Sequence, residues 1–176
     1  MLTALVSSVF ALTMALPPSH ASTPTLARAI GPGPVGIADS VVIEKRSHRL
    51  TLFHMGRPMR IYHVALGRDP DKDKVSAGDR RTPEGLFSVE ARNANSQYHL
   101  ALRLSYPDLR HRTIAEQLGV SPGGDIMIHG LPNGRHKVGA FHRTKDWTNG
   151  CIALTDQEIE EIWSAVPVGT PVEIKA

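Results

Sequence analysis

The pattern of apolar and polar positions indicates mainly β structure from residue 37 onward. Short runs rich in β-branched and other apolar residues, separated by glycine and proline turns, are typical of strands. Such runs occur at residues 41–43, 50–53, 59–66, 86–89, 98–104, 125–128 and 172–174. We therefore predict a mainly β fold, a β-sandwich with one or two helices.

Two segments carry helical signals. Thr155 and Glu158 have the spacing of a capping box, apolar residues then recur at helical intervals, and Pro167 ends the pattern. Residues 113–118 predict a second, short helix that ends at Gly119. Two short helices do not change the prediction of a mainly β fold.

The first residues bear on the compartment. Residues 2–16 are apolar or small and uncharged, which is too short to span a bilayer but suits the core of a signal peptide. Because no Lys or Arg precedes this run, an uncleaved or buried apolar helix is the alternative. We expect residues 1–21 to be a signal peptide, residues 22–36 a flexible lead and residues 37–176 one domain. Export to the periplasm or cell envelope follows, without stable membrane insertion after cleavage.

Composition narrows the possible partners. The net charge is +3 and aromatic residues make up 5% of the chain, and no Lys/Arg run is dense enough for a nucleic-acid arm. We therefore expect no nucleic-acid partner. The mild positive charge fits a solvated surface, or weak attraction to an anionic polymer such as the cell wall. Composition does not predict an oligomeric state.

The single cysteine, Cys151, cannot form an internal disulfide, so its thiol is inert, intermolecular or catalytic. It ends the polar turn Thr148-Asn149-Gly150-Cys151. Glycine permits a backbone conformation closed to other residues, and a nucleophile after such a turn is presented beside backbone N–H groups. A small buried core cysteine is the alternative.

His129 follows a predicted strand and is a candidate base for Cys151. A neighbouring imidazole can take the thiol proton and leave a thiolate–imidazolium pair. Taken alone, His129 is more typical of a hydrogen-bonded, half-buried structural histidine. The Gly-Cys turn farther along the chain favours the catalytic interpretation.

These motifs together resemble the signature of the L,D-transpeptidase catalytic family, which has the YkuD-type fold. That family carries His-Gly or His-Ser, then Ser/Thr-x-Gly-Cys, and this chain has His-Gly at 129–130 and Thr-Asn-Gly-Cys at 148–151. Thr-Pro-Glu-Gly at 82–85 is similar to the family's Thr-Pro-x-Gly turn. The resemblance covers residues 41–174, and the order of the motifs is more specific than any one of them.

The resemblance implies a reaction and a set of roles. Cys151 is the nucleophile that attacks the L-to-D link of a peptidoglycan stem peptide, and His129 is its base. The Gly130 carbonyl orients the imidazole. The amides of Asn149, Gly150 and Cys151 are the oxyanion donors. An amine acceptor gives a cross-link, water gives a carboxypeptidase or endopeptidase, and neither reaction needs a cofactor.

The chain departs from the family at three places. Ala153 stands where many members have Arg or Asn, and Asn149 stands where a His is common. The segment near residues 137–147 is longer than in many members. These departures leave the Cys–His chemistry intact but bear on the substrate and the acceptor.

Three residues are candidates for substrate binding. Arg143 is a candidate contact for a substrate carboxylate, although an exposed, solvated arginine is the alternative. Trp147 could line a groove or simply pack its loop, and Thr148 is its neighbour in the motif. We expect these side chains to lie beside the nucleophile.

Two rival functions remain open. His136 and His142, with His129, would suggest a zinc peptidase, but the chain has no His-x-x-Glu-His motif, so we expect no metal. A non-catalytic peptidoglycan-binding module is the second rival, and it predicts a buried, unreactive Cys151.

Overall fold

The computed structural model describes residues 35–176. The predicted signal peptide (1–21), and the predicted lead (22–36) except for its last two residues, lie outside this range. Within the described residues we find no helix with the length and apolarity that a membrane crossing requires.

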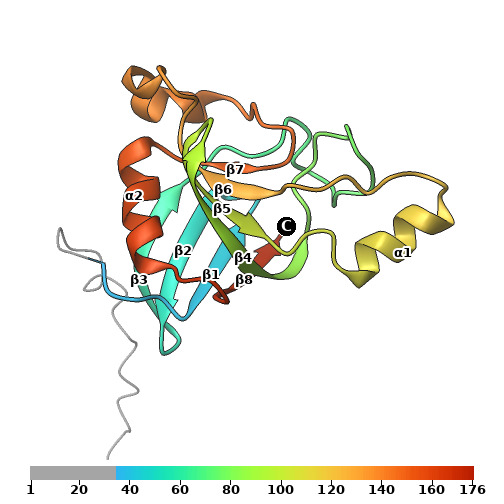
Figure 1. Cartoon of the computed structure of the whole chain (residues 1–176), viewed down its shortest axis with the longest axis horizontal. Helices are drawn as coiled ribbons and strands as arrows, with labels where there is room; N and C mark the ends of the chain where they lie inside the picture. The colour runs from blue at the N-terminus through green and yellow to red at the C-terminus, as the bar shows by residue number, and fades with distance from the viewer. Residues whose placement is uncertain (1–34) are drawn as a thin grey trace, which may run out of the picture.

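The described strands form one eight-stranded sheet in the order β3-β2-β1-β8-β4-β5-β6-β7 (Figure 1). The strands are β1 (Ser40–Glu44), β2 (Arg49–His54), β3 (Arg57–His63), β4 (Gly85–Ser96), β5 (His99–Leu104), β6 (Met127–His129), β7 (Ile152–Ala153) and β8 (Pro171–Lys175). Pairing is antiparallel except between β1 and β8 and between β6 and β7. The mainly β prediction is confirmed.

The long strand β4 belongs to both halves of the sheet. Its first residues, from Gly85 to Ser88, pair with β8, and its later residues pair with β5. A register shift after Val89 marks the change of partner, which is where a bulge bends a strand. Residues from both halves share one core, so the sheet folds over itself in the manner of a sandwich.

Strand periodicity accounts for this core. In β1 and β2 every second residue points into the core. These residues are fully buried: Val41 and Ile43 of β1, and Leu50 and Leu52 of β2. Burying one such side chain stabilises the fold by about 1.5–3 kcal/mol. Of the two described residues before Ile37, Val35 packs against the edge of the core.

Two α-helices flank the sheet (Figure 1). Helix α2 (Asp156–Ala165) buries Ile159 and Ile162 and packs against β5, as its apolar spacing predicts. Helix α1 (Leu109–Gln117) begins earlier than the predicted 113–118, because the Asp108 side chain accepts a hydrogen bond from the His111 N–H and caps it.

A third helical segment, the 3-10 helix η2 (His136–Thr144), was not predicted. It is kinked at Gly139, whose φ is 49°, and it has no side-chain cap. Its conformation depends on a tertiary contact, an ion pair between Arg143 and Glu158. Such a contact leaves no periodic signal in the sequence.

The capping box of α2 gives a stability prediction. The Thr155 hydroxyl accepts from the Glu158 N–H (3.3 Å), and the Glu158 carboxylate accepts from the Thr155 N–H (3.0 Å). Thr155→Ala should lower the free energy of unfolding by about 1 kcal/mol, measured by urea denaturation. Thr155→Ser keeps the hydroxyl and is the matched control. An equal loss in both variants would show that the methyl group, not the cap, is responsible.

Candidate active site

The pairing of β6 with β7 places the two candidate catalytic residues together. The strands run parallel, with Ile128 opposite Ile152 and His129 opposite Ala153. Ile128 and Ile152 point into the core. Because side chains alternate along a strand, His129 and Cys151, which directly precedes β7, share the opposite face.

His129 is held in one orientation. Its ring is buried, with 3% of the residue exposed, and its Nδ1 donates to the Gly130 carbonyl oxygen at 2.7 Å. That bond leaves Nε2 as the nitrogen able to accept a proton. Gly130 is needed here, because an added Cβ would lie 2.8 Å from an Asp156 carboxylate oxygen and 3.0 Å from the Tyr98 carbonyl.

The turn before Cys151 is built by Thr148 and Gly150. The Thr148 hydroxyl donates to the Cys151 carbonyl at 2.7 Å and accepts from the Gly150 N–H at 3.1 Å. Gly150 has a φ of 131°, and an added Cβ would lie 2.6 Å from the Arg81 carbonyl oxygen. No other residue fits this turn without shifting backbone.

These bonds correct two of the expected roles. Thr148 is buried and its hydroxyl serves the turn, so it positions Cys151 instead of facing a substrate. The Gly150 N–H already donates to Thr148, so its expected role as an oxyanion donor has a competing partner in this structure. Asn149 and Cys151 remain the oxyanion donors expected from the sequence.

Burial favours the neutral forms of both the thiol and the imidazole. Burial raises the pKa of the Cys151 thiol, against a backbone hydrogen bond from Met127, and Sγ lies 3.4 Å from the Asp125 carbonyl oxygen, as a donating S–H would. Burial lowers the pKa of His129 to about 4, against the hydrogen bond to Gly130. The burial of both groups thus works against the thiolate–imidazolium pair expected from the sequence, which stays a prediction.

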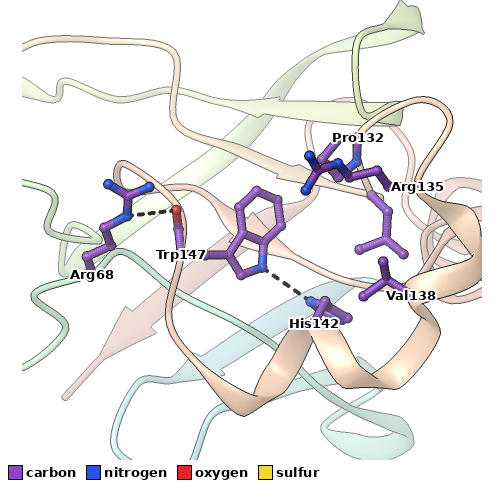
Figure 2. Close-up of a pocket in the computed structure, with 7 residues that line it drawn as sticks. Arg68, Pro132, Arg135, Val138, His142 and Trp147 are labelled. Carbon is purple, nitrogen blue, oxygen red and sulfur yellow. Dashed lines mark hydrogen bonds between the residues drawn. The ribbon is translucent and has the colours of Figure 1, made fainter.

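Aromatic rings surround the base. The His129 ring centroid lies 4.5 Å from that of Tyr98 and 5.9 Å from that of Trp147. The Trp147 Nε1–H points to His142 Nδ1 at 3.5 Å, which steadies the indole (Figure 2). Trp147 thus packs beside the base, and its other surfaces face a pocket.

This pocket has a volume of about 330 Å³. It is lined by Arg68, Leu131, Pro132, Arg135, Val138, His142 and Trp147. In Figure 2 the indole stands between Arg68 and the Arg135 side of the pocket. Sequence reasoning missed both arginines, because neither belongs to a motif and the chain brings them together only on folding.

The structure gives Arg143 a different role from the expected one. Its guanidinium pairs with Glu158, which belongs to the α2 capping box, and this ties η2 to α2. Arg143 does not line the pocket. The expected substrate contact of Arg143 stays a prediction that this ion pair does not favour, and Arg68 and Arg135 are the arginines that line the pocket.

The histidines considered as zinc ligands occupy different environments. His142 is buried and burial lowers its pKa to about 4, whereas His136 is exposed at the start of η2. Among residues 35–176, no three His, Cys, Asp or Glu side chains gather as a group that could hold a metal ion.

The site geometry and the sequence now identify the family. Residues 38–174 match the L,D-transpeptidase catalytic domain family, YkuD. The chain belongs to this family. The resemblance seen in the sequence is thereby confirmed over nearly the whole described part of the chain.

Known members and solved structures agree with this assignment. YqjB of Bacillus subtilis (strain 168), named provisionally as an L,D-transpeptidase, is 30% identical over 148 residues, which cover 82% of this chain and 76% of YqjB. The fold is shared with the helical cell shape determining protein Pgp2 from Campylobacter jejuni (TM-score 0.59, 23% identity, 82% of this chain and 52% of Pgp2). It is shared also with an L,D-transpeptidase from Xylanimonas cellulosilytica DSM 15894 (TM-score 0.51, 17% identity, 80% of this chain and 61% of that one). The chain thus spans about half the length of Pgp2.

The neutral Cys–His pair of this L,D-transpeptidase family member predicts a pH profile. Because burial disfavours the thiolate, alkylation of Cys151 by iodoacetamide should rise with pH and have its midpoint above that of an ordinary thiol, about 8.5. Intact mass measures the rate, and Cys151→Ser is the unreactive control. A plateau already reached at about pH 6 would instead indicate a preformed thiolate–imidazolium pair.

Proposed function

We propose that the protein is an exported cysteine acyltransferase, a peptidoglycan L,D-transpeptidase whose Cys151 forms a thioester with a stem peptide. The observation that carries the proposal is the β6–β7 register, which puts Cys151 on the same face as His129. The Gly130 carbonyl fixes His129 Nδ1, so Nε2 is left for proton transfer. Membership of the L,D-transpeptidase family supports the substrate class.

Acylation begins from the neutral pair. As Sγ of Cys151 attacks the carbonyl carbon of the L-to-D link, the thiol proton moves to Nε2 of His129. Backbone amides of the 148–151 turn, with Asn149 and Cys151 the candidates, face the resulting oxyanion. When the tetrahedral intermediate collapses, the C–N bond breaks and His129 returns the proton to the departing amine. The products are a thioester on Cys151 and a free terminal D-residue.

Deacylation uses the same groups in reverse order. An amine from a second stem gives a proton to His129 and attacks the thioester carbon. The C–S bond then breaks as the new amide forms, and His129 returns the proton to sulfur, which restores the thiol. Water in place of the amine gives a free acid, which makes the enzyme a carboxypeptidase or endopeptidase. The second outcome shares the same nucleophile and base, so the products distinguish the two.

The setting we propose is the periplasm or cell envelope, with peptidoglycan stem peptides as partners. Residues 1–21 would be the signal peptide, 22–36 a lead and 37–176 the catalytic domain. The name of Pgp2 assigns that protein to helical cell shape. We extend to this chain a role in cell wall biogenesis, with an effect on cell shape as its consequence.

Purified peptidoglycan fragments test the activity. Wild-type protein should release the terminal D-residue and form cross-linked dimers, both visible by mass spectrometry. Cys151→Ser should abolish turnover, and His129→Ala should lower it by about a hundredfold or more, because no group remains to move the proton. A carbapenem should add covalently to Cys151 and not to the Ser variant. Binding to peptidoglycan without products or adduct would support the non-catalytic module instead.

Export makes a separate prediction. N-terminal sequencing of the protein from the native envelope should find a start near Ser22, because a signal peptidase cleaves after small residues such as Ala21. Recovery of the intact form from the cytosol would contradict export while leaving the chemistry of Cys151 untouched.

A further inference from the structure

The pocket beside Trp147 is placed next to the catalytic base. The Trp147 ring centroid lies 5.9 Å from the His129 ring centroid, and the same indole lines the pocket. A substrate group that reaches past His129 along this side therefore enters the pocket. Trp147 thus links the pocket, which it lines, to the ring of His129, which shares a face with Cys151.

The pocket is lined by both positively charged and apolar side chains. Leu131, which is buried, together with Pro132 and Val138 supplies the apolar lining. Arg68 and Arg135 are both exposed, and within residues 35–176 neither has a carboxylate within 4.0 Å. Arg68 Nε donates to the Trp147 carbonyl at 3.1 Å, which anchors the side chain and leaves its terminal nitrogens for a ligand (Figure 2).

We propose that Arg68 and Arg135 bind the α-carboxylate of the residue whose amine leaves during acylation, so that this pocket is the leaving-residue subsite. The inference rests on the proposed function and deepens it by assigning the recognition of the free C-terminus of the stem. Arginine suits the task, because its guanidinium presents a fork of donors that matches a carboxylate.

The chemistry of the reaction requires such an arrangement of groups. The amine that His129 must protonate and the free carboxylate are attached to the same carbon of the terminal D-residue. An amine within reach of Nε2 can therefore carry its carboxylate toward Trp147, whose ring centroid lies 5.9 Å from that of His129, and toward the arginines that line the same pocket. The apolar lining residues Leu131 and Val138 are then available to the side chain of the same residue. A volume of about 330 Å³ suits one amino-acid residue and not a glycan chain.

The experiment compares two synthetic donors, a stem peptide ending in a free D-residue and the same peptide with a C-terminal amide. For each donor, kcat/KM for release of the terminal residue is measured with wild type, Arg68→Gln, Arg135→Gln and the double variant. The ratio of the two kcat/KM values isolates recognition of the carboxylate, because the intrinsic difference between the leaving amines cancels between variants.

Each single variant should lower the preference for the free carboxylate about threefold to tenfold, and the double variant should lower it further, since exposed charge-assisted contacts are of moderate strength. Arg68→Lys and Arg135→Lys, which keep the charge, should restore part of the preference. Arg112→Gln, an exposed arginine of α1 away from the pocket, is the matched control and should leave the ratio unchanged. Melting temperatures establish that the variants are folded.

The outcomes separate the two proposals. If wild type releases nothing from either donor and Cys151 gains no adduct, the proposed function fails. If wild type turns over both donors but the ratio stays the same in the folded Gln variants, the subsite assignment is overturned and the proposed function stands. A fall in kcat/KM that is equal for both donors also overturns it, because that pattern indicates a structural role for the arginines.

Discussion

The parallel pairing of β6 with β7 is the interaction on which the site depends. It joins only a few residues, yet it fixes which side chains face the core and which, with His129 and Cys151, face the opposite side. A slip of one residue would turn His129 into the core and Ile128 outward. The buried pair Ile128 and Ile152 opposes that slip, because exposing both would forfeit roughly 1.5–3 kcal/mol for each side chain. The core thus specifies the alignment of the Cys–His pair.

Burial sets the protonation of that pair as well as its position. Removing an imidazole and a thiol from water disfavours their charged forms, so both shifts favour the neutral state. A neutral imidazole is a competent base, and the Gly130 carbonyl that orients it also stabilises the imidazolium that forms when it accepts the proton. In the mechanism that we propose, proton transfer is then coupled to attack on the substrate, and burial limits the reaction of the idle thiol with other electrophiles.

The sequence alone predicted the elements that carry a periodic apolar pattern or a helix-capping motif. Short apolar runs located every strand except β7 (Ile152–Ala153), which is too short to carry a periodic signal, and the capping box at Thr155 located α2. It was insufficient where exposed polar residues form regular structure: the end of β4, Arg92 to Ser96, has no apolar alternation and is held by pairing with β5. It also did not reveal that Arg143 pairs with Glu158, because nearness in sequence to Cys151 carries no signal of that contact. Arg68 could be placed at the pocket only from tertiary structure.

The segment that presents the thiol is anchored at both ends to the other half of the sandwich. Asp146 accepts hydrogen bonds from the Leu66 N–H (2.7 Å) and from His48 Nε2 (2.9 Å). The Thr148 N–H donates to the Leu66 carbonyl at 3.1 Å, and the Thr148 hydroxyl closes the turn on Cys151. Trp147 lies between these anchors in the chain, so the backbone that carries its indole is held by bonds close to the turn that presents Cys151. The backbone of the pocket wall at Trp147 and the backbone of the thiol are therefore positioned by one set of hydrogen bonds.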